Sequence, residues 1–168
     1  MKLLRINLGC GEDWKGDGVI NFDWRNLTPP PGIIFLRGDV INVEDYFEWE
    51  SAEEVWALEI LEHFGQHETR RLLDDWIRLL KPGGILHLET PDLEALARFI
   101  LQTGKDPVWS DEQLGKHVYG VGDYPGGYHK MGFTRKYLRQ LLEERGMTVL
   151  SITGTPRCHT SLYITACR

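Results

Sequence analysis

Short apolar runs alternate along the chain with polar, glycine-rich or amphipathic segments. Five of these runs have the length of a β-strand, at residues 3–8, 18–23, 33–36, 53–60 and 85–90. The first is apolar enough to be buried on both faces, which is typical of a strand inside a parallel sheet. Two more strands are predicted at about 147–153 and 161–167, joined across Thr155-Pro156-Arg157 by a hairpin-like connection.

Three segments have the spacing of amphipathic helices. One apolar stripe predicts a helix over about 67–81, and Pro82-Gly83-Gly84 ends it and turns the chain. Asp92 is a suitable N-cap for a second helix. Thr134 is a suitable N-cap for a third, which closes at Gly146.

Strands that alternate with helices predict an α/β fold. We expect one domain over residues 1–168, built on a doubly wound, mostly parallel sheet of about seven strands with an antiparallel C-terminal hairpin. Connections 12–17 and 25–32 are too short or too rich in proline for a full helix, so the first two crossover helices should be reduced or absent. Residues 105–133 hold glycines and aromatics without a period, and we expect this segment to cap a substrate.

Composition narrows the functional class. Hydrophobic residues at 42% and charged residues at 26% are ordinary for a globular domain. The net charge is −6, and no Lys or Arg lies between Arg37 and Arg70, which argues against binding to nucleic acid. No apolar run approaches about 20 residues, so we expect no membrane span.

The cysteines and the N-terminus predict a location. Three widely spaced cysteines give neither a disulfide framework nor paired zinc-ligand spacing, so we expect a reducing, cytoplasmic compartment and no metal. The N-terminal residues lack the pattern of a signal peptide.

Candidate binding residues follow the predicted strands. Gly9-Cys10-Gly11 ends the first strand, and glycine lets the backbone turn sharply beside a ligand. Asp23 ends the second strand and Asp39 the third, where one carboxylate could accept from a ribose diol and the other from an adenine amine. Each feature also fits an ordinary turn. A nicotinamide dinucleotide is disfavoured, because Trp14 stands where the third glycine of that motif belongs and Asp23 follows Gly11 by only twelve residues.

The order of these motifs along the chain matches that of a known enzyme family. Together with Leu61-Glu62-His63, Lys81-Pro82-Gly83-Gly84, His129 and Gly132-Phe133-Thr134, they resemble the class I S-adenosylmethionine-dependent methyltransferases over roughly residues 3–150. The likeness is closest to small predicted methyltransferases associated with polysaccharide synthesis. It implies a Rossmann-like methyltransferase fold and S-adenosylmethionine as cofactor.

The resemblance implies roles for individual residues. Gly9, Cys10 and Gly11 would bend around the methionine part and the ribose, and Asp23 would hold the ribose hydroxyls. The remaining cofactor contacts would be Trp24 near the adenine, Asp39 and Val40 at the adenine edge, and Leu58 and Glu59 at the methionine end.

Two histidines are candidate bases for the acceptor. His63 follows the fourth strand and His129 lies in the glycine- and tyrosine-rich segment, so both could take a proton from a hydroxyl. His63 could instead cap or pack at a helix start. Tyr128 is the candidate substrate contact, whereas Cys10 is expected to be a packing residue, since no basic neighbour would lower its pKa.

The leading interpretation is an enzyme that methylates a small polar acceptor, through O-methylation of a saccharide or sugar intermediate. The alternative is a non-catalytic binding module that keeps the methyltransferase fold, which the missing crossover helices would favour. A nicotinamide-dependent oxidoreductase is the third interpretation, disfavoured by Trp14 and Asp23.

Overall fold

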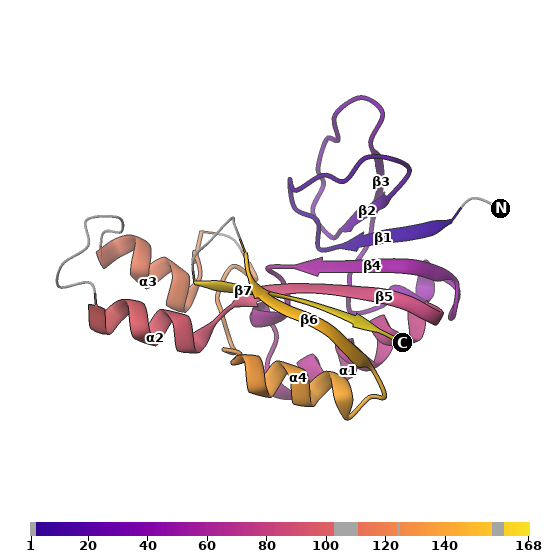
Figure 1. Cartoon of the computed structure of the whole chain (residues 1–168). Coiled ribbons are helices and arrows are strands. Elements are labelled where there is room, and N and C mark those ends of the chain that lie inside the picture. The colour runs from indigo at the N-terminus through magenta and orange to yellow at the C-terminus, as the bar shows by residue number, and fades with distance from the viewer. Residues whose placement is uncertain (1–2, 103–110, 124, 156–159) are drawn as a thin grey trace.

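The computed structural model describes residues 3–102, 111–123, 125–155 and 160–168. It contains one seven-stranded sheet with the order β3-β2-β1-β4-β5-β7-β6 (Figure 1). The strands are β1 (Leu4–Leu8), β2 (Ile20–Asp23), β3 (Ile34–Arg37), β4 (Ala52–Leu58), β5 (Leu80–Pro91), β6 (Thr148–Gly154) and β7 (Ser161–Cys167). β1 to β5 pair in parallel, and β7 pairs antiparallel with β5 and β6. The predicted mixed α/β sheet with its antiparallel C-terminal pair is confirmed.

Four α-helices and two 3-10 turns are described. They are η1 (Val43–Asp45), η2 (Leu61–His63), α1 (Gln66–Leu79), α2 (Leu93–Gln102), α3 (Asp111–Tyr119) and α4 (Arg135–Glu143). Thr134 caps α4 as predicted, with its hydroxyl accepting from the backbone N–H of Tyr137. None of the described helices is long and apolar enough to cross a membrane.

The turn expected at Pro82-Gly83-Gly84 has a different structure. Helix α1 ends at Leu79 and β5 begins at once, so the chain enters the sheet five residues earlier than the predicted strand. Pairing with β4 jumps from Ala52↔Leu80 to Glu54↔Ile85, which leaves the Pro-Gly-Gly segment as an irregularity inside the strand. The Gly83 N–H donates to the Arg168 carbonyl, so the last residue of the chain satisfies the irregular backbone.

Helices α1 and α4 pack on the same side of the sheet (Figure 1). Trp76 of α1 and Leu141 of α4 are fully buried with Ile6, Val55 and Leu86 of the strands. Successive side chains of a strand point to opposite faces. The other face therefore carries the intervening residues, and Trp56 of β4 and Ile85 and His87 of β5 are only half-buried there.

A short loop covers part of that second face where a crossover helix is missing. Between β1 and β2 the described chain has no helix, as the length of 12–17 predicted. Trp14 packs edge-on against Phe35 of β3 with ring centroids 5.6 Å apart. The Lys15 ammonium lies 5.3 Å from the ring centroid of Trp56 on β4. Trp14, which breaks the dinucleotide motif, thus helps this loop to cover the sheet.

Two buried asparagines satisfy the backbone of this loop. The Asn21 Oδ1 accepts from the Lys15 N–H at 2.8 Å, and the Asn21 Nδ2 donates to the Lys15 carbonyl at 2.8 Å. The Asn7 Nδ2 donates to the Asp13 carbonyl at 2.9 Å and to Asn21 Oδ1 at 3.0 Å. A helix would satisfy its own backbone; here side chains of β1 and β2 do so instead.

We expect Asn21→Ala to destabilise the protein by about 2–3 kcal/mol, because it removes the buried amide that bonds to the Lys15 N–H and to the Lys15 and Ile34 carbonyls. Urea denaturation followed by circular dichroism measures the change. Asn26→Ala, at an exposed position after β2, is the matched control and should change stability by less than about 0.5 kcal/mol. Equal effects of the two substitutions would contradict this account of the loop.

Candidate functional site

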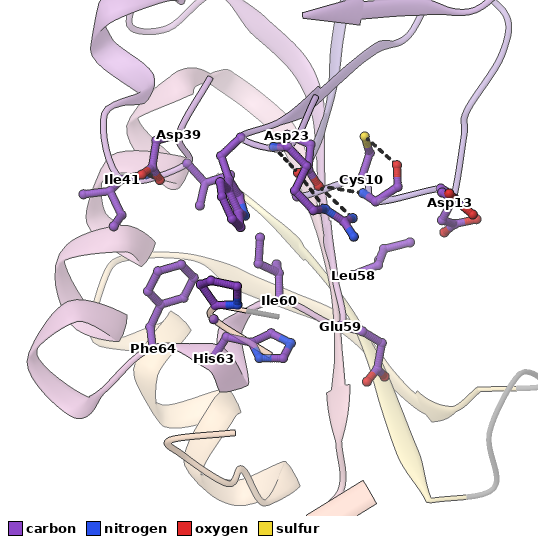
Figure 2. A pocket seen from close by; sticks show the side chains of 18 of the residues that line it. Cys10, Asp13, Asp23, Asp39, Ile41, Leu58, Glu59, Ile60, His63 and Phe64 are labelled. Atoms are coloured by element: carbon purple, nitrogen blue, oxygen red, sulfur yellow. Dashed lines mark hydrogen bonds and ion pairs between the residues drawn. The ribbon is translucent and has the colours of Figure 1, made fainter. Parts of the chain in front are cut away.

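A cavity of about 420 Å³ lies at the carboxyl ends of β1, β2 and β4 (Figure 2). We call it the strand-end cavity. Its lining includes every residue predicted to hold the cofactor, together with one of the two candidate bases: Gly9, Cys10, Gly11, Asp23, Trp24, Asp39, Val40, Leu58, Glu59 and His63. Sheet order explains this convergence, because β1 lies between β2 and β4 and the chain crosses over in opposite directions from it.

The bend after β1 needs glycine at two positions. Gly9 has φ +59° and Gly11 has φ +53°, in the left-handed region that side chains disfavour. A methyl group on Gly9 would also overlap the Ile60 side chain. The Cys10 N–H donates to the Phe22 carbonyl at 3.2 Å, so the bend is held against the end of β2.

Asp23 ties this bend to β2. Its carboxylate is almost fully buried, and Oδ2 accepts from the Gly11 N–H at 2.8 Å. Oδ1 accepts from the Arg25 backbone N–H at 2.9 Å and from the Arg25 Nε at 3.1 Å, and Nη2 of Arg25 donates to Oδ2 at 3.3 Å. A carboxylate has about four lone-pair sites, so the Arg25 guanidinium must release one or both of its own before a hydroxyl pair can use Asp23.

Asp39 presents a second carboxylate from the end of β3. It is exposed, and its Oδ1 accepts from the Ile41 N–H at 3.0 Å, which fixes the side chain at the cavity edge. The neighbouring Val40 is buried, and the Trp76 indole N–H donates to its carbonyl at 3.2 Å. Trp24 remains 47% exposed, so its ring has a free face for a ligand.

The Cys10 thiol is held in its neutral form. Burial, together with the nearby Asp23 carboxylate, raises its pKa to about 12. A thiol at neutral pH is a poor nucleophile. The structure thus agrees with a packing role for Cys10.

A second cavity, of about 520 Å³, adjoins the first. We call it the histidine cavity; its walls are Glu59, Glu62, His63, Gln113, Lys116, His117, Gly120, Val121, Gly127 and His129. Glu59 and His63 line both cavities, so the two meet there. Of these two cavities, His129 lines only the histidine cavity. Tyr128 is 60% exposed and lines neither of the two.

Backbone hydrogen bonds bring the two candidate bases together across 66 positions of sequence. The Lys130 and Met131 N–H groups both donate to the Glu62 carbonyl, at 2.8 and 3.2 Å. The His63 Nδ1 bonds to the Tyr128 carbonyl at 3.1 Å. The rings of His63 and His129 then lie edge to face with centroids 5.0 Å apart.

Both imidazoles are neutral near pH 7. Burial, followed by the nearby His63, lowers the pKa of His129 to about 4. Burial likewise lowers the pKa of His63. Each ring can therefore accept a proton, although two protonated rings this close would repel each other.

Buried carboxylates complete the floor of the histidine cavity. Glu62 is 1% exposed, and burial and the neighbouring Glu59 raise its pKa well above the usual range. Burial also raises the pKa of Glu59, whose backbone has φ +51° and whose N–H donates to the Glu89 carbonyl at 2.8 Å. A strained residue at the meeting point of two cavities is typical of functional sites.

Sequence reasoning missed three of these charged groups. Glu62 stood inside a quoted motif, but no local pattern tells that its side chain is buried. Arg25 follows Asp23 by two residues and could have been considered as its partner. Glu89 is buried two residues before the end of β5, close to the edge where strand-end chemistry is expected, but the apolar run at 85–90 predicts only a strand there.

The segment expected to cap the substrate contributes to both cavities. Pro125, Gly126 and Lys130 line the strand-end cavity, and α3 is the helical part of the segment. Two of its aromatic residues, Trp109 and Tyr124, lie outside the described residues. Its role as a cap stays a prediction.

We expect Cys10 to react with iodoacetamide at pH 8 at least tenfold more slowly in the folded chain than in 8 M urea, because burial keeps the thiol protonated. Peptide mass spectrometry over a time course measures the rate. The urea-unfolded protein is the internal control, and equal rates in the two states would contradict the neutral, buried thiol.

The chain is similar to known methyltransferases in part of its sequence and in its fold. Residues 18–88 match the family model described as Methyltransferase domain. A structure of an S-adenosylmethionine dependent methyltransferase from Mesorhizobium loti is 16% identical, with 99% of this chain and 91% of that chain aligned at a TM-score of 0.68. A SAM dependent methyltransferase from Archaeoglobus fulgidus is 15% identical, with 99% and 86% aligned at a TM-score of 0.64.

A third solved structure contains a ligand. The 1,6-didemethyltoxoflavin-N1-methyltransferase from Burkholderia thailandensis, with bound 1,6-didemethyltoxoflavin and S-adenosylhomocysteine, is 16% identical, with 98% of this chain and 70% of that chain aligned at a TM-score of 0.67. No curated protein matches this chain. The structural likenesses show the fold that these methyltransferases share, and the match to the methyltransferase domain model covers residues 18–88, which is less than half of the chain.

Proposed function

We propose that this chain is an S-adenosylmethionine-dependent methyltransferase that methylates a hydroxyl of a small polar acceptor, and that the acceptor is a saccharide or a sugar intermediate. The observation that carries the proposal is the meeting of the two cavities at Glu59 and His63. One cavity has the groups that suit the cofactor, and the other has the groups that suit a polyhydroxylated acceptor.

The strand-end cavity suits the cofactor. The exposed Asp39 carboxylate can accept from the adenine amine, and Trp24 can pack beside the ring. Asp23 can accept from the ribose hydroxyls once Arg25 yields, and the glycine bend leaves backbone close to the ligand. Glu59 lies where it can meet the methionine ammonium. S-adenosylmethionine supplies an activated methyl group on a sulfonium.

The histidine cavity suits the acceptor. Its walls carry hydrogen-bonding side chains of both kinds, among them Gln113, Lys116 and His129. A sugar needs such donors and acceptors for its several hydroxyls, and the exposed Tyr128 ring could pack on a sugar face. The resemblance to methyltransferases associated with polysaccharide synthesis supports the same class.

The chain's own residues would position the acceptor and remove its proton. A hydroxyl placed at the junction of the cavities would be held in line with the methyl group, which is the main requirement of the transfer. The neutral imidazole of His129 or His63 would then accept the hydroxyl proton.

The expected cytoplasmic location rests on the cysteines, of which Cys10 and Cys167 are free thiols.

We expect the purified protein to bind S-adenosylmethionine in a calorimetric titration, and Asp39→Ala to weaken that binding about tenfold by removing one charged hydrogen-bond acceptor. Asp45→Ala, an exposed acid on η1 outside the strand-end cavity, is the matched control and should bind as the wild type does. No heat at millimolar cofactor would reject the proposed function.

We expect His129→Ala to lower turnover by about 10²–10⁴-fold, the usual contribution of a general base, while the affinity for S-adenosylmethionine changes less than twofold. Transfer of radiolabelled methyl groups to a panel of mono- and oligosaccharides gives the first quantity, and calorimetry the second. Loss of cofactor binding in this variant would show that His129 belongs to the cofactor side. Transfer to amines but to no hydroxyl compound would refute the acceptor class.

A further inference from the structure

Three metal-ligating side chains meet in the wall of the histidine cavity. One ligand atom from each of Glu62, His63 and His129 can be chosen so that all lie within 4.8 Å of one another. Glu62 and His63 come from η2, and His129 comes from the segment after α3. Nitrogen from two imidazoles and oxygen from one carboxylate is a donor set that suits Zn²⁺ and its first-row neighbours.

The cluster is held in place by the backbone. Two N–H groups, of Lys130 and Met131, are fixed on the Glu62 carbonyl, and the His129 N–H donates to the Tyr119 carbonyl at 3.0 Å. These backbone bonds hold His129 beside His63, and they involve neither imidazole ring. The three side chains are thus brought together before a cation arrives, which lowers the cost of binding.

The hydrogen bond of His63 to Tyr128 leaves the Nε2 atom of the ring available to a metal ion. Its Nδ1 lies 3.1 Å from the Tyr128 carbonyl, which can only accept, so Nδ1 carries the proton. The lone pair of the neutral ring is then on Nε2. Metal-binding histidines commonly donate their second ring N–H to a carbonyl in this way.

Glu62 has an oxygen with no partner. Its Oε2 accepts from the Thr90 hydroxyl at 3.2 Å, whereas Oε1 is buried and has no hydrogen-bond partner among the described residues. A buried polar atom without a partner costs about 1–3 kcal/mol and calls for a ligand, an ion or a proton.

The lysines at the rim of the histidine cavity are paired with other acids. The Lys116 ammonium is 2.8 Å from Glu112, and the Lys130 ammonium is 4.0 Å from Glu68. Neither pair involves Glu62, so neither of these lysines occupies the place of a cation beside it.

We propose that Glu62, His63 and His129 bind one divalent transition-metal ion, of the class that includes Zn²⁺, Mn²⁺ and Co²⁺. The cysteines led us to expect no metal, and these three ligands have no recognisable spacing either, because two are adjacent and the third is 66 positions away. The ion would lie on the acceptor side of the junction, where a cation lowers the pKa of a nearby hydroxyl. That role rests on the proposed function, and in the loaded protein it would take the place of proton removal by His63 or His129, whose lone pairs the ion would occupy; the binding itself does not rest on the proposed function.

Metal binding to the EDTA-treated full chain tests the proposal. Calorimetric titration with ZnCl₂ and MnCl₂ should show one ion per chain, and Co²⁺ should give a visible absorption band. His63→Ala, His129→Ala and Glu62→Gln should each weaken affinity at least tenfold and remove the cobalt band. His67→Ala removes an exposed histidine on α1 and is the matched control, which should bind as the wild type does.

Thermal unfolding of each variant checks that the chain still folds. If Glu62→Gln does not fold, the two histidine variants test the metal site. Absence of binding up to millimolar metal would overturn the proposal and would favour a proton shared between Glu59 and Glu62, whose Oε1 atoms both lack partners among the described residues. Undiminished binding in the histidine variants would also overturn it. Titration with S-adenosylmethionine in EDTA separates the two proposals: cofactor binding without metal binding refutes only the metal site.

Discussion

The site depends on β1 forming hydrogen bonds with β2 on one side and with β4 on the other. Parallel pairing fixes the register of all three strands, so their carboxyl ends stop at one edge and leave a crevice between connections that diverge. The glycine bend, Asp23 and Glu59 each follow one of these strands. Without that pairing, the glycine bend, Asp23 and Glu59 would not line one cavity and could not bind one ligand together.

The short connection between β1 and β2 shows how the fold manages without a crossover helix. Asn7 and Asn21 satisfy the loop's backbone, and Trp14 and Lys15 cover aromatic residues of β3 and β4. On the cavity side, Asp23 accepts from Gly11 and Arg25 and so anchors the bend. Polar side chains thus do locally what a helix would do through its own hydrogen bonds and packed face. The same arrangement gives Asp23 a second partner to release before it can serve a ligand.

The histidine cavity is built by a different kind of contact. Nothing in the local sequence joins η2 to residues 128–131, yet the Glu62 carbonyl receives two N–H groups from that segment. This clamp positions His129 beside His63 and closes the cavity over Glu59 and Glu62. Burial then keeps both imidazoles neutral and favours the protonated form of the carboxyl groups.

The sequence alone was sufficient for the sheet, the missing first crossovers, the cap at Thr134 and the convergence of Gly9, Asp23 and Asp39 on one cavity. These features are local: apolar period, proline content and strand-end position depend on residues close in the chain. The entry of α1 directly into β5 was missed, because the bonds from Gly83 and Gly84 to Arg168 span the chain. The burial of Glu62, the pairing of Arg25 with Asp23 and the meeting of His63 with His129 were decided only by tertiary structure. Burial and long-range hydrogen bonds are collective properties of the packed chain, so no window of sequence contains them.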